Sequence, residues 1–566
     1  MKISANLPAA KIFPALKARA DQPSLFILLV LIVFFFAAVA PASANTNSIW
    51  VYYTNGTSGP LTYKPLPTNP DNNGDDGQDQ IMDFSGAGYG GGGVTLPIST
   101  APVEANVSPS GDTSGKTDTS NIQKAIKNVS ALGLSNGFRG EVLLAAGCYY
   151  INAGLTIQAS GVVLRGAGDS TCADGGSQIT MVAVAAGGTP YPFLAISGSG
   201  TPEAVGDSRA ITDQYVPAGA LTVHVTNAST YFAAGDTVLI KRPVTADWVT
   251  FMGMNDVGAT WLSPGSTLNE DRTIQSVSGN TITLDVPVSD SIDSIVLGQS
   301  ASVLQYSYTG RISNVGLEYV RVIAPAINNG GLGDVVNDPS YQLVTMQAVI
   351  DSWVHDVIAQ DTLESIEIGT QTNPNAKRIT VSDVDISHTV TQSGTGALFE
   401  ELSVWGTQVL FDTIKSTADN QFFFSTESAT QGPNVLRNST FNGNISIEPH
   451  QRWATGLLVE NTTITGDSDG PGYIDLRDRG TDGPGQGWTI GWGVVWNSTL
   501  YSSGAYYVIQ APPGSENWCI GCIGTQDLQV PPGGSGDAPQ GEIDSSGSYI
   551  TNMPGGSLYQ AQLNAR

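Results

Sequence analysis

The stretch Thr380-Val-Ser-Asp383-Val-Asp-Ile386 decides the fold, because similar segments recur along the C-terminal half of the chain. Each copy is an apolar run that leads to an Asp or Asn and then to a further apolar position. The aligned polar residues are spaced 27, 29, 26, 23 and 36 residues apart. A period of roughly 20 to 50 residues is typical of stacked repeats. The aligned residues are Asp356, Asp383, Asp412, Asn438, Asn461 and Asn497.

These repeats are expected to be strands that end in turns. They are short β-branched runs, and the Asn or Asp that follows tolerates the left-handed backbone of a tight turn. In a β-solenoid, equivalent positions of successive coils lie about 4.8 Å apart, which is the spacing of paired strands. Residues one period apart in the sequence are therefore expected to be neighbours in space.

The N-terminus has the three parts of a secretory signal. Basic residues precede an apolar run at 25–40, and Pro41-Ala-Ser-Ala44 follows directly. The pattern predicts a signal peptide at 1–44, cleavage after Ala44 and a secreted, extracellular protein. An uncleaved membrane anchor is the alternative, since the apolar run is nearly long enough to span a bilayer.

Composition and charge narrow the class of protein. Of 566 residues, 66 are Gly and 31 are Pro, which suits many turns and few helices. The formal net charge of −26 disfavours nucleic acid and anionic membranes as partners. Four cysteines in an exported chain predict two disulfides, Cys148 with Cys172 and Cys519 with Cys522. A redox or zinc pair is the alternative for Cys519 and Cys522.

Six segments are expected along the chain. The signal peptide is followed by a Gly- and Pro-rich strap at 45–112, and 113–200 forms an N-terminal cap with the first coils. A short helix starts near Asp118. Residues 201–300 have the pattern of antiparallel hairpins and are predicted to be an inserted β subdomain. The main β-helix occupies 301–525, and 526–566 is a tail that packs on it.

The cap carries a resemblance to a known family. The segment TDTSNIQKAIKN at 117–128, followed by apolar strands at 141–151, 155–157 and 162–166, resembles the opening of right-handed parallel β-helix proteins of the pectate-lyase-like superfamily. The resemblance implies an all-β fold, a right-handed parallel β-helix with a capping helix, here with the inserted subdomain. It also implies a polysaccharide substrate, a groove along one face, and usually lyase or glycosidase activity. The motifs of polygalacturonases and of the best-known pectate lyases are absent, so the site is inferred from coil alignment.

Four neighbouring coils end their second strand in ionisable side chains, which stacking would bring to one edge. His450, one of four histidines, lies in the middle of this set. Two tryptophans nearby have faces that suit a sugar ring. The candidate catalytic residues are Glu401, Glu427, Glu448, His450, Arg452, Asp475 and Arg477, and the candidate substrate-binding residues are Trp453, Trp488 and Arg479.

These residues fit two chemistries. In β-elimination on a uronate-containing glycan, the favoured hypothesis, arginines neutralise the carboxylate and His450 is the base. In glycoside hydrolysis, two carboxylates act as a pair, either Glu401 with Glu448 or Glu427 with Asp475. A non-catalytic carbohydrate-binding β-helix is a third alternative, and a ladder of ion pairs that holds the loops in register is the structural one.

No cofactor is indicated with certainty. Calcium is possible at Asp71, Asn73, Asp75 and Asp79, whose spacing is like that of a calcium loop, although its Gly and closing Glu are missing. Some glycosylation sequons coincide with repeat turns, where a structural role is favoured. The eight sequons are at Asn55, Asn106, Asn128, Asn227, Asn438, Asn444, Asn461 and Asn497.

Overall fold

The computed structural model describes most of the chain after residue 78. The described residues are 79–185, 188–258, 261–326, 340–390, 400–417, 422–443, 446–466, 472–501, 506–526, 541–543 and 556–566. The predicted signal peptide, most of the strap, and Asp71, Asn73 and Asp75 of the calcium hypothesis lie outside them. No helix among the described residues is long and apolar enough to cross a membrane.

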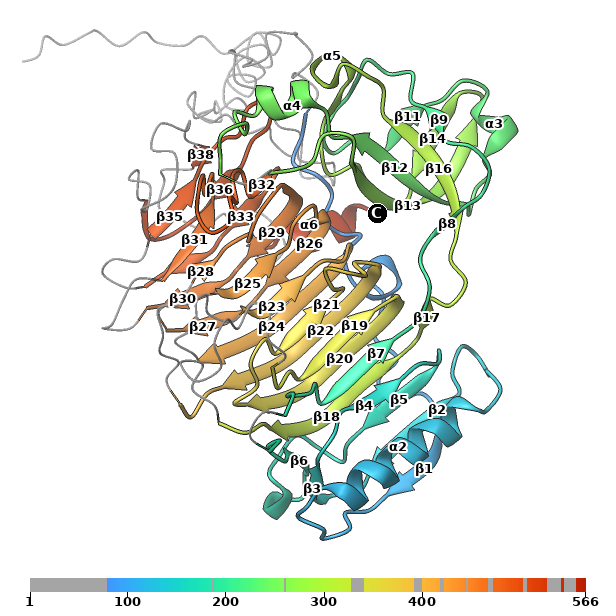
Figure 1. The fold of residues 1–566 in the computed structure, drawn as a ribbon, viewed down its shortest axis with the longest axis vertical. Helices are drawn as coiled ribbons and strands as arrows, with labels where there is room; N and C mark the ends of the chain where they lie inside the picture. The colour runs from blue at the N-terminus through green and yellow to red at the C-terminus, as the bar shows by residue number, and fades with distance from the viewer. Residues whose placement is uncertain are drawn as a thin grey trace, which may run out of the picture. The chain divides into compact units, whose positions relative to one another are not determined.

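The main body is a parallel β-helix in which each coil adds strands to two long sheets (Figure 1). One sheet has ten strands, all paired in parallel with the equivalent strand of the next coil. Its strands are β4 Leu155–Ile157, β7 Leu194–Ser197, β19 Val344–Gln347, β21 Ile366–Ile368, β23 Glu400–Val404, β25 Phe422–Thr426, β28 Ser446–Ile447, β31 Tyr473–Leu476, β35 Tyr506–Ile509 and β37 Thr525–Gln526.

The other sheet has 19 strands and contains the sequence repeat. Thr380 of β22 pairs with Trp353 before it and with Leu410 after it, so the copies stack one above another. The fold is a right-handed parallel β-helix, the hand that parallel crossover connections take in general. Its repeat strands are β18 Gly316–Ile323, β20 Val349–Gln360, β22 Ala376–Ser387, β24 Val409–Thr417, β26 Gln431–Arg437, β29 Ala454–Glu460, β33 Val494–Trp496 and β36 Trp518–Ile520.

The turn residues of the repeat adopt the left-handed backbone that the sequence pattern predicts. Asp356 and Asp383 have φ values of 54° and 55°, and Asn438, Asn461 and Asn497 lie between 47° and 52°. One alignment is wrong by a single position. Asp412 pairs with Ser382, and the next residue, Thr413, has the positive φ of 61°. The Asp412 side chain still joins the stack, since Asn438 Nδ2 donates to its Oδ1 at 2.8 Å.

A helix covers the N-terminal end of the solenoid. Helix α2, Lys116–Ser130, buries its apolar face, including Ile122, Ile126 and Val129, against the first coils. The first coils consist of β2 Gly140–Leu144, β3 Gly147–Ile151, β5 Val162–Arg165 and β6 Ser177–Met181. Disulfides join Cys148 to Cys172 in this region and Cys519 to Cys522 near the other end.

An antiparallel subdomain interrupts the coils. The sheet of this subdomain extends beyond residue 300, where the sequence predicted its end. Strand β16, Ser302–Ser307, still pairs antiparallel with β12, Thr237–Pro243, and parallel pairing resumes at β17, Ile312–Ser313. Its principal strands are β8 Glu203–Ala204, β9 Arg209–Ala210, β11 Thr222–His224, β12 Thr237–Pro243, β13 Thr267–Ser278, β14 Thr281–Leu284 and β16 Ser302–Ser307. Short helices α3 Ala228–Tyr231, α4 Ala246–Phe251 and α5 Ser294–Leu297 accompany them.

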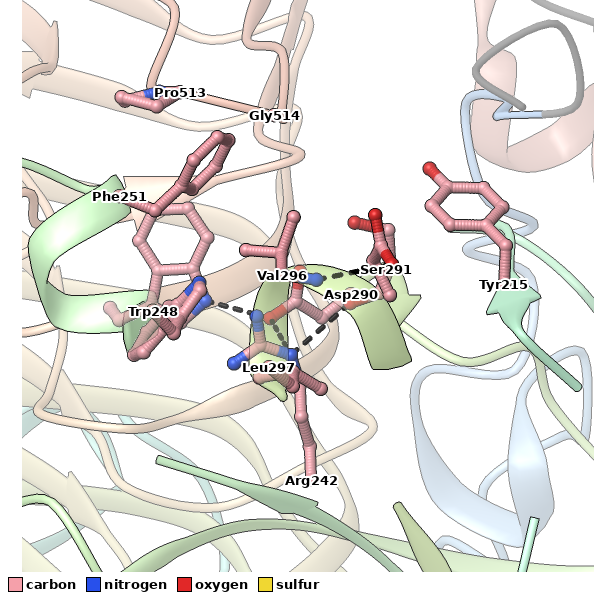
Figure 2. A pocket seen from close by; sticks show the side chains of 12 residues that line it. Tyr215, Arg242, Trp248, Phe251, Asp290, Ser291, Val296, Leu297, Pro513 and Gly514 are labelled. Carbon is pink, nitrogen blue, oxygen red and sulfur yellow. Dashed lines mark hydrogen bonds and ion pairs between the residues drawn. The ribbon is translucent and has the colours of Figure 1, made fainter. Parts of the chain in front are cut away.

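An aromatic cluster fixes this insertion to the β-helix. Trp453 of the β-helix lies 5.7 and 6.0 Å from the rings of Trp248 and Trp261, edge to face. Its indole Nε1 donates to Asp290 Oδ2 at 2.8 Å. Figure 2 shows Arg242 beside Trp248 and Asp290, with its guanidinium 4.2 Å from the indole ring. The apolar cluster crosses between the two parts, so the insertion is held in place by packing.

The two ends of the described chain meet on the 19-stranded sheet. Helix α6, Leu558–Ala565, buries Leu558 and Tyr559, and Tyr559 N donates to Glu460 Oε2 at 2.9 Å. Gln562 bonds to the backbone of Met82 and Phe84 in the segment from the N-terminal side. The outer face of this sheet is therefore covered by chain from both termini.

Candidate active site

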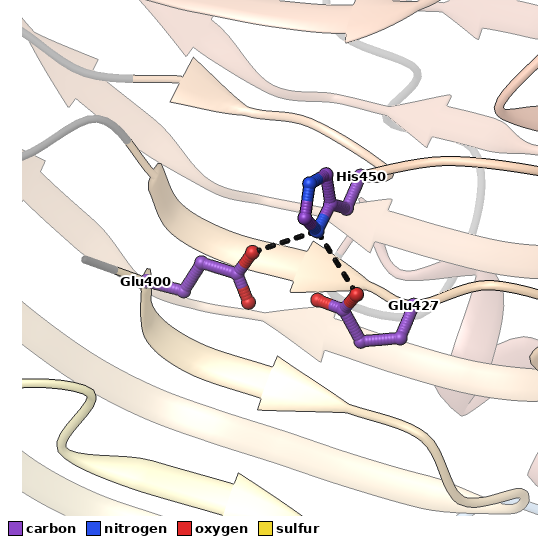
Figure 3. Close-up of side chains that lie close together, drawn as sticks. All are labelled: Glu400, Glu427 and His450. Atoms are coloured by element: carbon purple, nitrogen blue, oxygen red, sulfur yellow. Dashed lines mark hydrogen bonds and ion pairs between the residues drawn. The ribbon is translucent and has the colours of Figure 1, made fainter. Parts of the chain in front are cut away.

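Three ionisable side chains from consecutive coils meet at the ten-stranded sheet. Glu400 begins β23, Glu427 directly follows β25, and His450 follows β28. His450 Nδ1 lies 3.0 Å from Glu400 Oε1 and 3.0 Å from Glu427 Oε2 (Figure 3). We call these three residues the Glu400 cluster. The stacking of coils thus brings residues 23 to 50 positions apart into hydrogen-bond contact.

A serine joins the two carboxylates of the cluster. Ser425 Oγ lies 2.7 Å from Glu400 Oε2 and 2.8 Å from Glu427 Oε1. One hydroxyl has a single proton and can donate to one of them. If Glu427 is protonated, it donates to Ser425 Oγ, and the hydroxyl donates to Glu400. The geometry therefore suits one protonated and one ionised carboxyl group.

The pKa values of the two carboxyl groups also suit one protonated and one ionised group. Burial raises the pKa of Glu427 to about 7, and the charge of Glu400 adds to this rise. Burial also acts to raise the pKa of Glu400, but the His450 charge and hydrogen bonds outweigh it and lower that pKa to about 2. Burial acts to lower the pKa of His450, yet the two carboxylates raise it to about 10. At neutral pH, Glu400 is ionised, His450 is an imidazolium, and Glu427 is close to its midpoint.

Two further carboxyl groups lie one coil earlier. Burial raises the pKa of Glu364 to about 9, with the charges of Glu367, Glu400 and Glu427 contributing. Burial raises the pKa of Glu367 to about 7. Gln342 Nε2 donates to Glu364 Oε2 at 3.2 Å. Carboxyl groups with raised pKa values therefore continue the Glu400 cluster towards the N-terminal coils.

A second charged group occupies the following coils. Arg477 bonds to Asp475 and lies 3.3 Å from Glu448 Oε1, and Arg479 Nε lies 2.9 Å from the same oxygen. Burial acts to lower the pKa of Arg477, but the charges of Asp475 and Glu448 outweigh this effect. The pKa is therefore raised above its ordinary value. We call Glu448, Asp475, Arg477 and Arg479 the arginine cluster. Its two carboxylates and two guanidiniums pair with each other.

The carboxyl groups of the two hydrolase pairs expected from the sequence bond to other residues. Glu401 is fully buried and bonds to Ser365 Oγ at 2.7 Å and to His388 Nε2. Asp475 bonds to Arg477, and Glu427 bonds to His450. Adjacent residues of one strand point to different neighbours, so coil alignment without the strand geometry selected Glu401 where Glu400 was required.

The prediction that Trp453 and Trp488 bind a sugar ring is wrong. Trp453 is 1% exposed and Trp488 is 3% exposed, because the insertion packs on both. Neither indole face is open to a ligand. Arg452 has a positive φ of 55°, and its Nε has no hydrogen-bond partner among the described residues. Arg479 donates to His450 O at 3.1 Å and stacks over Phe422, so it supports the Glu400 cluster from the side.

Sequence reasoning missed Glu400, Glu364 and Glu367. Glu400 was within the aligned segment, one position from the residue selected. Glu364 and Glu367 follow the repeat turn at Asp356, so extending the same alignment by one coil finds them. The insertion could not be placed against Trp453 and Trp488 from periodicity, because a contact between distant segments leaves no repeat.

The Glu400 cluster is also the set of described residues that could hold a metal ion. Its three ligand atoms lie within 4.8 Å of one another, and two carboxylates with an imidazole suit several divalent ions. The 3.0 Å contacts at His450 Nδ1 are hydrogen-bond distances, which a shared proton satisfies. Asp79, from the calcium hypothesis, accepts from Tyr215 Oη at 2.6 Å and from Ala218 N at 2.9 Å.

No family model matches the sequence. No curated protein matches it by sequence either. Solved structures do resemble the chain. The tailspike protein gp49 from Pseudomonas phage LKA1 is 14% identical with a TM-score of 0.36, over 76% of this chain and 72% of that one. The polygalacturonase from Erwinia carotovora ssp. carotovora is 11% identical with a TM-score of 0.34, over 81% and 98%.

A third solved structure is the A-module of the Azotobacter vinelandii mannuronan C-5 epimerase AlgE6. It is 14% identical with a TM-score of 0.26, over 75% of this chain and 94% of that one. These similarities are too distant to carry an argument about activity. The parallel pairing of successive coils itself makes the chain a parallel β-helix protein, the fold that the sequence predicts.

Proposed function

We propose that this protein is a polysaccharide-degrading enzyme that hydrolyses glycosidic bonds at the Glu400 cluster. The observation that supports this most strongly is a pair of neighbouring carboxyl groups whose pKa values move in opposite directions. The pKa of Glu427 is raised to about 7 and that of Glu400 is lowered to about 2. A pair of titratable groups pushed apart in this way suits an acid and its ionised partner.

In this proposal, Glu427 is the general acid. Its raised pKa keeps a substantial fraction protonated near neutral pH. In this proposal, the proton that Glu427 donates to Ser425 Oγ in the free enzyme is transferred to the oxygen of the leaving sugar. Ser425 and His450 hold its two oxygens at 2.8 and 3.0 Å and so fix the orientation of the carboxyl group. After the bond breaks, the same carboxylate can accept a proton from water.

Glu400 is the ionised partner. Its lowered pKa keeps it negative, and the His450 imidazolium balances that charge in a largely buried site. The acid and the ionised carboxylate present oxygens within 4.8 Å of each other. Retaining glycosidases place their two carboxyl groups roughly 5 to 5.5 Å apart, whereas inverting ones leave room for water. We therefore propose that Glu400 is the nucleophile and that the anomeric configuration is retained.

β-Elimination, favoured by the sequence, requires a base that lacks a proton. His450 has a pKa raised to about 10, so it is protonated at neutral pH and does not suit that role. Of the three arginines expected to neutralise a uronate, Arg477 and Arg479 are paired with Glu448 and Asp475, whereas Arg452 is not part of these pairs. These observations favour hydrolysis. Export, with cleavage after Ala44, remains part of the proposal as predicted from the sequence.

A panel of neutral and uronate polysaccharides tests the proposed reaction. Both new reducing ends and the ultraviolet absorbance of unsaturated products are followed. Hydrolysis gives reducing ends without absorbance, elimination gives both, and a carbohydrate-binding module gives neither. Proton NMR of the first product then reports its anomer. Retention supports Glu400 as nucleophile, and inversion contradicts that role.

A further inference from the structure

A groove separates the inserted subdomain from the β-helix and has no assigned role. Its volume is about 380 Å³. Strands β12 and β13 of the insertion contribute one wall, with Leu239 and Asn269. The chain that leaves β23 and β25 of the β-helix contributes the other, with Trp405 and Ser428. We call this space the insertion groove.

The walls of this groove are fixed in place. The insertion is anchored by the aromatic cluster around Trp453 on one side. Below the groove, Lys377 of the β-helix is 1% exposed and its Nζ lies 2.9 Å from Asp271 Oδ1 of β13. A groove whose walls are joined by buried packing and an ion pair is preorganised, which lowers the entropic cost of binding.

The lining is polar but has no surplus of charge. Asp271 and Arg311 are the charged residues among the described side chains that line it, and they pair at 2.9 Å. The side chain of Arg311 is 8% exposed, and its Nε has no hydrogen-bond partner among the described residues. The rest of the polar lining consists of amide and hydroxyl side chains: Asn269, Gln371, Asn375, Gln431, Thr267, Thr407 and Ser428. Amide and hydroxyl groups both donate and accept, which suits sugar hydroxyls.

Trp405 supplies an apolar face at the level of the Glu400 cluster. Val404 at the end of β23 pairs with Thr426 at the end of β25. Trp405 and Glu427 are the next residues, so they leave neighbouring strands at the same level. Trp405 is partly exposed, whereas Trp453 and Trp488 are buried. Ser428, which lines the groove, directly follows Glu427.

We propose that the insertion groove binds a neutral saccharide segment next to the bond that is cleaved, with Trp405 stacking on a sugar face. This rests on the proposed function, and it narrows the substrate to an uncharged stretch of polysaccharide. The balanced charge of the lining does not attract a uronate, and the net charge of −26 repels polyanions at long range. A neutral sugar also lacks the carboxylate that β-elimination needs.

The test measures binding separately from cleavage. Calorimetric titrations use Glu427→Gln protein with cellohexaose, xylohexaose and mannohexaose as neutral probes, and with hexagalacturonate and hexamannuronate as charged ones. At least one neutral probe is expected to bind more tightly than both uronates. Trp405→Ala should weaken that binding roughly tenfold or more, as expected for loss of an aromatic anchor. Trp405→Phe, which keeps an aromatic face, should restore most of it.

The matched control is Tyr501→Ala, which removes an aromatic side chain that is 67% exposed and does not line the groove. It should bind as the parent does. Failure of every neutral probe to bind, tighter binding of a uronate, or unchanged binding by Trp405→Ala overturns the groove proposal. If Glu427→Gln protein still cleaves polysaccharide at the wild-type rate, the proposed catalytic role fails, while the effect of Trp405→Ala on binding still decides the groove.

Discussion

The Glu400 cluster and the arginine cluster occupy successive coils of one sheet, and both are largely buried. They differ in charge balance. In the arginine cluster, each of the two buried carboxylates has a guanidinium partner, and the more exposed Asp482 lies 3.9 and 3.8 Å from Arg477 and Arg479. In the Glu400 cluster, two carboxylates share one imidazolium, and Glu364 and Glu367 add to the acidic excess.

This difference separates two uses of the same residue types. A buried network in which each carboxylate has a guanidinium partner holds neighbouring coils together. Burial still raises the pKa of Asp475 to about 7, although the charge of Arg477 acts to lower it. An unbalanced network forces some carboxyl groups to remain protonated near neutral pH, which is the state that acid catalysis needs. His450, predicted from the sequence to be a base, is thus held by its carboxylate neighbours as a cation at neutral pH.

Substitutions of the two carboxyl groups should have the largest effects. Glu427→Gln removes the proton donor and Glu400→Gln removes the nucleophile, so each is expected to lower turnover roughly a thousandfold. Initial rates of reducing-end release measure this. Glu401→Gln is the matched control, because it makes the same change on the adjacent residue, whose partners are Ser365 and His388. Equal losses for Glu400→Gln and Glu401→Gln would contradict the assignment.

The arginine cluster should respond in stability. Arg477→Met leaves Asp475 without its buried cationic partner, while Glu448 keeps Arg479, and the expected loss is about 3 to 5 kcal/mol of unfolding free energy. Denaturant titration measures it. Arg378→Met breaks a more exposed pair with Asp351 and should cost about 1 kcal/mol or less. Turnover per folded Arg477→Met molecule should stay near the wild-type value, and its collapse would place the arginine cluster in catalysis.

The effect of His450→Gln should be smaller and should appear in the pKa of Glu427, the proposed acid. The imidazolium lowers the pKa of Glu427, so its removal should move the upper limb of the pH–rate profile above about 7, by roughly one unit. A profile that keeps its position while the rate is lost would show that His450 acts directly on the substrate.

The same variant tests the stability that His450 contributes. The pKa of His450 is raised from 6.5 to about 10, so its contribution is complete below about 6.5 and disappears as the pH rises through about 10. Wild type should therefore exceed His450→Gln in unfolding free energy most at the lower end of this window. Denaturant titrations across it measure the difference, and a constant difference would exclude the ion pairs as its source.

Much of the fold could be predicted from the repeat. The period of the Asp and Asn turns identified the coils, and residues of successive coils were correctly expected to converge. The side-chain partners could not be predicted, because neighbours such as Glu400 and Glu401 diverge by the geometry of one strand. Trp453 and Trp488 were misread for a different reason, since the insertion that buries them is distant in the sequence. The raised pKa of His450 depends on two carboxylates from two other coils.

The most direct measurement is the pH dependence of kcat/KM on a cleaved polysaccharide, followed by reducing ends and ultraviolet absorbance together. If Glu427 is the acid, the rate falls as the pH rises through about 7, and no unsaturated product accumulates. If His450 is instead the base of an elimination, the rate climbs towards about 10, where the imidazolium loses its proton, and absorbance rises with the reducing ends. The first result is the one predicted here, and the second would contradict it.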